Sequence, residues 1–189
     1  MTPGRIRLAS VDDALRIARI HVQGWRETYP GIVPDRSLRA MSVDERYRFW
    51  LEILSDPGCG QSVFVAEIGP AIVGFGVCGP EQVGLSEFDG EIHALYLLRT
   101  VQGRGLGSSL MSVMAADLTD RAWTRISVWV LRDNWPARRF YERLGARRVA
   151  HRPLYFDGTE VMEMGYGWND IRKLVRGCAE VSAVREGRR

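Results

Sequence analysis

The chain has 189 residues, of which 46% are hydrophobic and 26% charged, a composition typical of a soluble globular protein long enough to bury a core. The formal net charge is only +3, and because residues 172–189 hold six basic and two acidic side chains, the rest of the chain is close to neutral and shows no excess typical of a nucleic-acid-binding face. The three cysteines share no C-x-x-C spacing and no stretch has the length of a signal peptide or membrane span, so we expect free thiols, no metal, no membrane contact and a cytoplasmic protein.

The spacing of apolar residues predicts strands and helices along the whole chain. Ser10, Ser42 and Asn134 stand where caps at helix starts are favoured, and Gly145 stands where a cap at a helix end is favoured. Gly69-Pro70 and Asp157-Gly158 predict the turns of two hairpins. The predicted elements are a strand at 6–9, helices from 14 to about 23 and between 42 and 56, strands at 63–68, 71–78 and 91–98, a helix after the turn at 102–107, a strand at 124–131, a helix from 133–136 to Gly145, and strands at 147–156 and 159–166. This order, β-α-α-β-β-β-α-β-α-β-β, predicts an α/β fold with a mixed sheet.

A glycine-rich turn directly follows the predicted strand at 91–98. It reads Gln-Gly-Arg-Gly-Leu-Gly over residues 102–107, and helical spacing of apolar residues begins at Leu106. Glycines let a ligand approach the backbone, and the unpaired N–H groups at a helix start attract anions, so the turn predicts a phosphate or pyrophosphate site. The spacing departs from the dinucleotide fingerprint, whose third glycine position is Ser108 here, and from the P-loop, which requires a lysine.

The pattern Q/R-x-x-G-x-G/A, read at Gln102, Gly105 and Gly107, resembles the acetyl-CoA pyrophosphate site of the GCN5-related N-acetyltransferase (GNAT) family. The segment from Asn134 to Ala146 resembles that family's N-x-x-A-x-x-F-Y-x-x-x-G-F/A segment, with alanine at the last position where many members have phenylalanine. The order of elements is also that of the family, and the resemblance covers residues 6–168. It implies a single N-acetyltransferase domain over residues 1–168, followed by a basic C-terminal tail over 169–189.

The resemblance implies a binding site for acetyl-CoA as the acyl donor. The backbone of residues 95–97 would pair with the pantetheine arm and polarise the thioester carbonyl, residues 102–108 would hold the pyrophosphate, and Asn134 would bond to the pantetheine. The predicted cofactor-binding residues are Leu95, Tyr96, Leu97, Gln102, Gly103, Arg104, Gly105, Leu106, Gly107, Ser108, Asn134 and Ala137.

Acyl transfer to an amine needs a base for the amine proton and an acid for the departing thiolate. The resemblance implies these roles for Glu91, at the start of the central strand, and for Tyr141, although a solvated strand-end carboxylate and a packed core phenol are the plainer structural interpretations. His93 shares the face of Glu91 if no β-bulge intervenes, and its near-neutral pKa suits a proton relay.

The sequence gives the least information about the residues that would bind the amine acceptor. In the resembling family, the link between the first helices lines the acceptor groove, which implies Trp25 and Tyr29, with His93, as substrate-binding residues. The acidic loop that holds Glu81, Glu87 and Asp89 would suit a cationic amine. We therefore predict direct transfer of an acetyl group from acetyl-CoA to the primary amine of a small molecule in a ternary complex. Acetylation of a protein N-terminus or lysine, transfer of a longer acyl group, a non-catalytic acyl-CoA sensor and a homodimer remain open alternatives.

Overall fold

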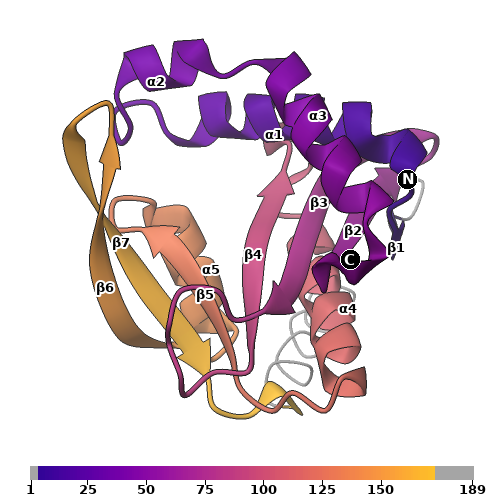
Figure 1. Ribbon diagram of the computed structural model, residues 1–189, viewed down its shortest axis with the longest axis vertical. Coiled ribbons are helices and arrows are strands. Elements are labelled where there is room, and N and C mark those ends of the chain that lie inside the picture. The colour runs from indigo at the N-terminus through magenta and orange to yellow at the C-terminus, as the bar shows by residue number, and fades with distance from the viewer. Residues whose placement is uncertain (1–3, 173–189) are drawn as a thin grey trace.

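The computed structural model describes residues 4–172, which form one seven-stranded sheet with helices on both faces (Figure 1). The order of the strands across the sheet is β1-β2-β3-β4-β5-β7-β6. The strands are β1 (Gly4–Leu8), β2 (Ser62–Ile68), β3 (Ala71–Pro80), β4 (Gly90–Leu97), β5 (Ile126–Leu131), β6 (Arg147–Phe156) and β7 (Thr159–Trp168). The α-helices are α1 (Ala14–Thr28), α2 (Asp35–Ala40), α3 (Val43–Ser55), α4 (Leu106–Asp120) and α5 (Trp135–Arg143). The predicted α/β mixed sheet is confirmed.

The centre of the sheet contains its one parallel pair among the described strands, β4 with β5. Only three residue pairs join them: Gly90 with Ile126, Glu91 with Ser127 and Ile92 with Val128. Beyond Ile92 the two strands diverge, and in Figure 1 their arrows point apart. The edge of β4 that faces β5 therefore presents backbone N–H and C=O groups that no strand pairs beyond this residue, and such groups need another partner.

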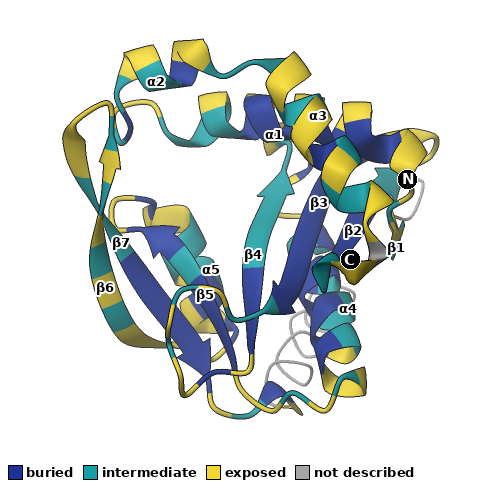
Figure 2. Cartoon of the chain, in the orientation of Figure 1, coloured by how far each residue is buried: buried dark blue, intermediate teal, exposed yellow. Residues whose placement is uncertain are grey.

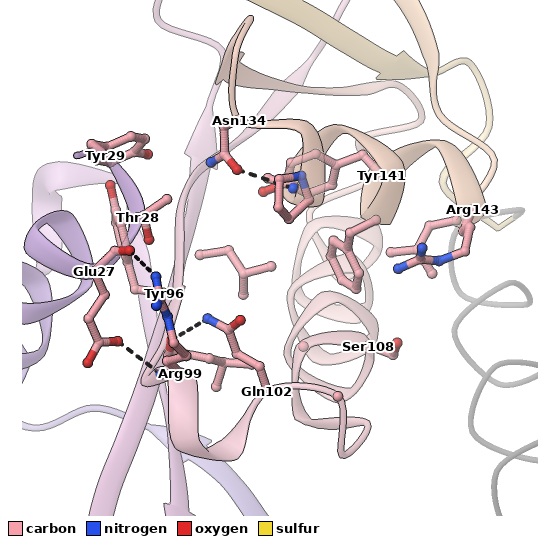
Figure 3. Close-up of a pocket in the computed structure, with 18 of the residues that line it drawn as sticks. Glu27, Thr28, Tyr29, Tyr96, Arg99, Gln102, Ser108, Asn134, Tyr141 and Arg143 are labelled. Carbon is pink, nitrogen blue, oxygen red and sulfur yellow. Dashed lines mark hydrogen bonds between the residues drawn. The ribbon is translucent and has the colours of Figure 1, made fainter. Parts of the chain in front are cut away.

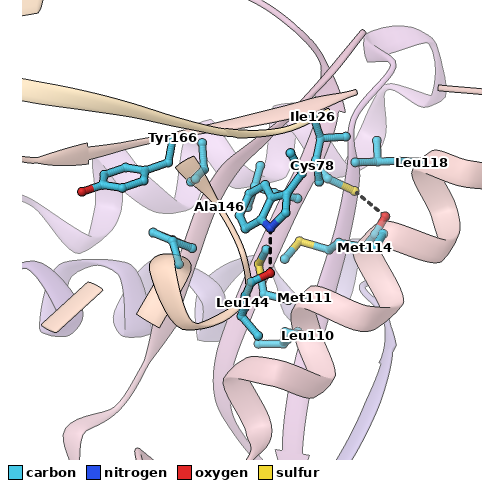
Figure 4. Close-up of a cluster of buried hydrophobic side chains, with 14 of the residues drawn as sticks. Cys78, Leu110, Met111, Met114, Leu118, Ile126, Leu144, Ala146 and Tyr166 are labelled. Atoms are coloured by element: carbon cyan, nitrogen blue, oxygen red, sulfur yellow. Dashed lines mark hydrogen bonds between the residues drawn. The ribbon is translucent and has the colours of Figure 1, made fainter. Parts of the chain in front are cut away.

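Each face of the sheet is covered by its own apolar core. On one face, side chains of α4 such as Leu110 and Met114 pack with Ile126 of β5 and Leu144 after α5 (Figure 4). On the other face, Ile17 and Ala18 of α1 and Trp50 of α3 pack on β2 and β3. Figure 2 shows the buried residues concentrated in the central strands and the exposed ones on the outer sides of the helices. Burial of apolar surface on both faces fixes the sheet between two helical layers.

The helices before β2 differ from the sequence prediction. Helix α1 continues to Thr28, five residues past the predicted end, because Gly24 lies inside the helix rather than ending it. A Cβ atom at this position would lie 2.9 Å from Cδ1 of Tyr96, so only a glycine lets α1 approach β4 this closely. The six-residue helix α2, which follows Pro34 between the two predicted helices, was also not predicted.

Several local signals act as predicted. The Ser42 hydroxyl accepts a hydrogen bond from the Glu45 backbone N–H at the start of α3 (3.4 Å), and the Asn134 side chain caps α5 through the Ala137 N–H (3.3 Å). Gly145, at φ 87°, follows α5 in the left-handed conformation that favours glycine.

Within residues 4–172 no helix is long and apolar enough to cross a membrane, and no cluster of three or more His, Cys, Asp or Glu side chains could hold a metal ion. Cys59 and Cys78 are free thiols, whereas Cys178 and most of the predicted basic tail, residues 173–189, lie outside the described residues.

Candidate active site

A cavity of about 570 Å³ opens where β4 and β5 diverge (Figure 3). Its walls come from the end of α1, the second half of β4, the turn before α4, and α5. Twelve residues that the sequence predicted for the cofactor, the acid role or the acceptor lie in these walls: Tyr29, Leu95, Tyr96, Leu97, Gln102, Gly103, Gly105, Gly107, Ser108, Asn134, Ala137 and Tyr141.

The glycine-rich turn forms one end of the cavity. Gly103 and Gly105 have φ values of 77° and 92°, and a Cβ atom at either position would meet nothing within 4 Å. No side chain caps the start of α4, which leaves the first N–H groups of the helix without a side-chain acceptor. Open space, uncapped N–H donors and the positive end of a 15-residue helix suit a pyrophosphate.

The other residues of the turn have different surroundings. The Gln102 side chain donates a hydrogen bond to the Leu97 carbonyl (2.9 Å) and so ties the turn to the end of β4. Gly107 lies beside α5, where a Cβ atom would make an ordinary van der Waals contact with the Phe140 ring at 3.4 Å from Cζ. The side chain of Leu106 is buried in the core, and the exposed Arg104 does not line the cavity, so neither of these predicted cofactor residues presents its side chain there.

Tyr141 lies in the wall that α5 contributes. Its side chain is buried, packing edge-on against Phe140 (ring centroids 5.3 Å apart) and Trp168 (6.2 Å). Burial raises the pKa of the phenol, so Tyr141 keeps its proton throughout the neutral range. A protonated phenol in the cavity wall can donate a proton or a hydrogen bond to a ligand.

Glu91 belongs to the middle of the three residue pairs that join β4 to β5, and it does not line the cavity itself. Only 6% of the residue's surface is exposed, and its Oε2 accepts one hydrogen bond, from the Gln82 backbone N–H at 3.3 Å. Burial raises the pKa of Glu91 to about 7, and the charge of Glu81 acts in the same direction. A carboxyl group with that pKa can accept a proton at neutral pH and release it again.

A β-bulge separates Glu91 from the residues that line the cavity. Val77 of β3 pairs with Ala94 and Cys78 pairs with Ile92, so His93 is the extra residue. The His93 ring hydrogen-bonds to the Pro80 carbonyl, its Nε2 atom has no partner among the described residues, and burial lowers its pKa. This is the bulge on which the prediction for His93 depended, and His93 does not line the cavity.

The bulge also changes which β4 side chains reach the cofactor side. Ile92 packs into the core under α4, and after the bulge Leu95 and Leu97 do so, whereas Ala94 and Tyr96 face the core under α1. The alternation of side chains is thus shifted by one residue beyond His93. This shift sets the orientation of the segment predicted to bind the pantetheine.

The link between α1 and α2 crosses to the hairpin of β6 and β7. Val33 and Leu38 are buried against Leu131, with Trp25 and Tyr29 packed around them. At the hairpin tip, Arg36 pairs with Asp157 (3.1 Å between Nε and Oδ2) and Ser37 also hydrogen-bonds to this carboxylate. The segment of residues 25–38, which we call the bridge, therefore spans the diverging strands.

Tyr29 belongs to both the bridge and the cavity wall. The Tyr29 hydroxyl interacts with the Tyr96 hydroxyl and the Asn134 side chain, and burial raises the pKa of Tyr29. The Trp25 ring stacks edge-on against Tyr29, with centroids 4.9 Å apart, but does not line the cavity. The predicted acceptor side and the predicted cofactor side thus meet at Tyr29.

Of the three acidic residues that the sequence places in the loop before β4, Glu81 and Asp89 accept hydrogen bonds from backbone N–H groups. The Asp89 carboxylate accepts hydrogen bonds from the backbone N–H groups of Thr124 and Arg125, at 2.9 and 3.1 Å, and the Glu81 carboxylate accepts from Val83 and Gly84. Their first role is to hold the loop. They therefore lend little support to the predicted recognition of a cationic amine.

Some residues that line the cavity were not among the site residues predicted from the sequence. The Arg99 backbone N–H donates to the Glu27 carboxylate (3.0 Å), so these two residues join the end of α1 to the turn. Because α1 was predicted to end near Gln23, its last turn was expected as part of the link that lines the acceptor groove, and not as a helical wall of the cofactor cavity. The lining residues that were not among the predicted site residues are Glu27, Thr28, Ile32, Arg99, Asp133, Pro136, Phe140, Arg143 and Leu144.

Comparison with known proteins follows the same features. The sequence model of the acetyltransferase (GNAT) family matches residues 22–146, a range that includes the bridge, β4, the glycine-rich turn and α5. The chain belongs to the GNAT family. Its chemistry is therefore that of an N-acetyltransferase that uses acetyl-CoA as the acyl donor.

Relatives and solved structures agree with the family assignment. The chain is 32% identical to YuaI of Bacillus subtilis, an uncharacterized N-acetyltransferase, over 89% of this chain and 95% of that protein. Its fold is similar to that of the PaiA N-acetyltransferase of Thermoplasma acidophilum, solved with coenzyme A (TM-score 0.70, 18% identity, 88% and 99% of the two chains). It is also similar to yncA of Salmonella typhimurium, solved with its cofactor acetyl-CoA (TM-score 0.67, 20% identity, 88% and 94%).

The residues of this GNAT chain fit acetyl-CoA. The uncapped start of α4 would hold the pyrophosphate, and the unpaired edge of β4 would pair with the pantetheine amides.

Proposed function

We propose that this N-acetyltransferase acts on the primary amine of a small molecule, by direct transfer in a ternary complex. The proposal rests on the placement of two buried groups around the point where β4 and β5 diverge. The carboxyl group of Glu91 lies on β4 just before this point, and the phenol of Tyr141, on α5, lines the cavity that opens beyond it. No covalent enzyme intermediate is invoked, since the sequence motif of a nucleophile elbow is absent.

In this proposal each residue has one task. Acetyl-CoA supplies a thioester carbonyl that an amine can attack. Glu91 accepts the proton that the ammonium group must lose, directly or through a water molecule, and a pKa near 7 leaves a large fraction of its carboxylate free at neutral pH. Tyr141 gives its phenolic proton to the departing sulfur. The N–H groups on the unpaired edge of β4 stabilise the carbonyl oxygen.

The bridge supports a small acceptor over a protein. Its packing on Leu131 and its contacts with Asp157 cover the side from which an acceptor would enter, and Trp25 and Tyr29 place two aromatic rings there. An extended peptide needs an open groove. A small amine needs only a gap.

The proposal is tested first by calorimetric titration of the protein with acetyl-CoA, with free CoA and NAD as comparisons. We expect micromolar binding of acetyl-CoA and no binding of NAD. Thiol release from acetyl-CoA is then measured with a panel of small primary amines and with peptides that carry a free N-terminus or a lysine. Faster turnover of peptides than of every small amine would contradict the proposed acceptor class, and binding of acetyl-CoA without thiol release in the presence of any acceptor would favour a sensor.

The role of Glu91 is tested in the same assay with Glu91→Gln. The amide cannot accept the proton, so we expect kcat/KM to fall about 10²–10⁴-fold while the Kd for acetyl-CoA stays within a few-fold. Wild-type turnover in this variant would remove the proposed base.

A further inference from the structure

Ser127 of β5 lies directly across from Glu91 of β4. The two residues form the middle of the three pairs that join the strands. Ile92, Ile126 and Val128 all pack into the core under α4, so the side chains of Glu91 and Ser127 point to the opposite face of the sheet. Neighbouring strands lie about 4.8 Å apart, so side chains paired across them on one face lie close enough for a glutamate carboxyl group and a serine hydroxyl to meet.

The Ser127 hydroxyl is fully buried and has no hydrogen-bond partner among the described residues. Such a group is expensive to leave unpaired, and buried hydroxyl groups in folded proteins are nearly always bonded. The carboxyl group of Glu91 accepts one hydrogen bond, from Gln82, and so has acceptor positions left. An unused donor thus faces a carboxyl group with unused acceptors.

We propose that Ser127 is a positioning residue, whose hydroxyl group donates a hydrogen bond to the Glu91 carboxylate when that carboxylate is ionised. The bond would hold Glu91 in its proton-accepting form and direct it toward the acceptor amine. When Glu91 has taken up a proton, the bond is weakened, because a neutral carboxyl oxygen is a poorer acceptor than a charged one. This inference rests on the proposed role of Glu91 as the base.

Other charged groups act on Glu91 from the elements around it. Glu81 of the loop before β4 and Glu163 of β7 disfavour its charge, whereas Arg152 of β6 and the Gln82 N–H favour it. Arg152 is itself paired with Glu163 (2.8 Å), which reduces the charge it can offer Glu91. The surrounding charges thus give the ionised carboxylate of Glu91 little net stabilisation, and a hydrogen bond from the Ser127 hydroxyl would add to it.

The test is a titration of the Glu91 side-chain carbonyl carbon by ¹³C NMR in the protein without substrates, assigned with Glu91→Gln. We expect Ser127→Ala to raise the titration midpoint of Glu91 by about one pH unit, since a hydrogen bond to a charged group is lost. Ser127→Cys keeps most of the volume but is a weak donor, so it should shift the midpoint almost as far. Ser62→Ala is the matched control, because it removes another buried serine hydroxyl, on β2, that donates to Asp117 and does not contact Glu91, and it should leave the midpoint unchanged.

In Ser127→Ala and Ser127→Cys, the acidic limb of the pH profile of kcat/KM should shift to higher pH together with the NMR midpoint. The Kd for acetyl-CoA should not change. A midpoint that stays at the wild-type value in Ser127→Ala would overturn the inference, and so would a shift in Ser127→Ala that Ser127→Cys does not share, since packing would then explain it. Because the NMR titration needs no turnover, its result is independent of whether Glu91→Gln retains activity, which tests the proposed function alone.

Discussion

At the scale of single residues, one physical cause prepares both proposed catalytic groups. Burial disfavours the charged form of an acid, and it raises the pKa of Glu91 to about 7 and the pKa of Tyr141 above its usual value near 10. The same displacement has opposite chemical consequences: the carboxyl group becomes a base that works near neutral pH, and the phenol remains a proton donor. Neither residue has an ion-pair partner among the described residues that would cancel this effect.

The burial of Glu91 predicts a pH-dependent effect on stability. Its pKa is about 7 when folded and 4.5 when unfolded, so the folded state holds the proton more tightly. Relative to a neutral side chain, the contribution of Glu91 to stability is full below pH 4.5 and is lost as the pH rises through 7. We expect Glu91→Gln to gain about 1–3 kcal/mol on wild type between pH 4.5 and pH 8, measured by urea unfolding. Unfolding curves that differ by the same amount at both pH values would contradict the raised pKa.

Replacement of Tyr141 by phenylalanine removes the proposed thiolate acid and keeps the packed ring. We expect turnover to fall about 10²-fold, with the Kd for acetyl-CoA within a few-fold of wild type, measured by thiol release and calorimetry. Tyr155→Phe is the control, because this exposed phenol on β6 bonds to Glu160 and does not line the cavity. If the two variants have equal activity, Tyr141 is not the acid.

At the scale of elements, the proposed cofactor site is formed by the end of β4, the glycine-rich turn and the start of α4. The strand ends at Leu97, Gln102 bonds back to that residue's carbonyl, and the positive φ of Gly105 lets α4 begin at once with its N–H groups toward the cavity. Each part is local in sequence, which is why the turn was recognisable before the fold was known. The parts act together only because β5 leaves β4 after Ile92 and opens the space in front of them.

Gly105→Glu should abolish binding of acetyl-CoA. The new side chain would project into space that is open in the protein, so the loss arises from bulk and negative charge at the anion site rather than from a clash with other residues. We expect the Kd to rise by roughly 10²-fold or more in calorimetry. Gly69→Glu is the matched control, since Gly69 also has a positive φ (58°) and open surroundings, in the turn between β2 and β3. Equal weakening of binding in both variants would indicate a general loss of structure.

At the scale of the whole molecule, the bridge joins two parts that are far apart in the chain. Residues near 25–38 pack on the hairpin of β6 and β7 more than a hundred residues later, and Tyr29 carries that contact into the cavity wall. The cofactor side of the divergence is built from neighbouring segments, whereas the acceptor side is closed only by this long-range contact. Changes at the hairpin tip are therefore expected to affect the acceptor and not the cofactor.

Arg36→Ala tests this separation. The ion pair with Asp157 is exposed on both sides and contributes less than about 1 kcal/mol, so the melting temperature should hardly change. We expect the KM for the amine acceptor to rise about three- to tenfold at unchanged Kd for acetyl-CoA, and added salt to bring wild type toward the variant. Arg39→Ala is the control on the same helix, because Arg39 pairs with Asp35 within α2. An altered Kd for acetyl-CoA in Arg36→Ala would show that the two sides are not independent.

The sequence by itself determined the order of the strands and of every α-helix except α2, the capped starts of α3 and α5, and the glycine-rich turn with its likeness to the GNAT family, because all of these depend on residues close together in the chain. Only the tertiary structure decided that Gly24 lies inside α1, that His93 is a bulge, that β4 and β5 part after Ile92, and that Glu91 is buried opposite Ser127. These features depend on which surfaces pack together, and a residue's burial, its pKa and the direction of its side chain are set by neighbours that are distant in sequence.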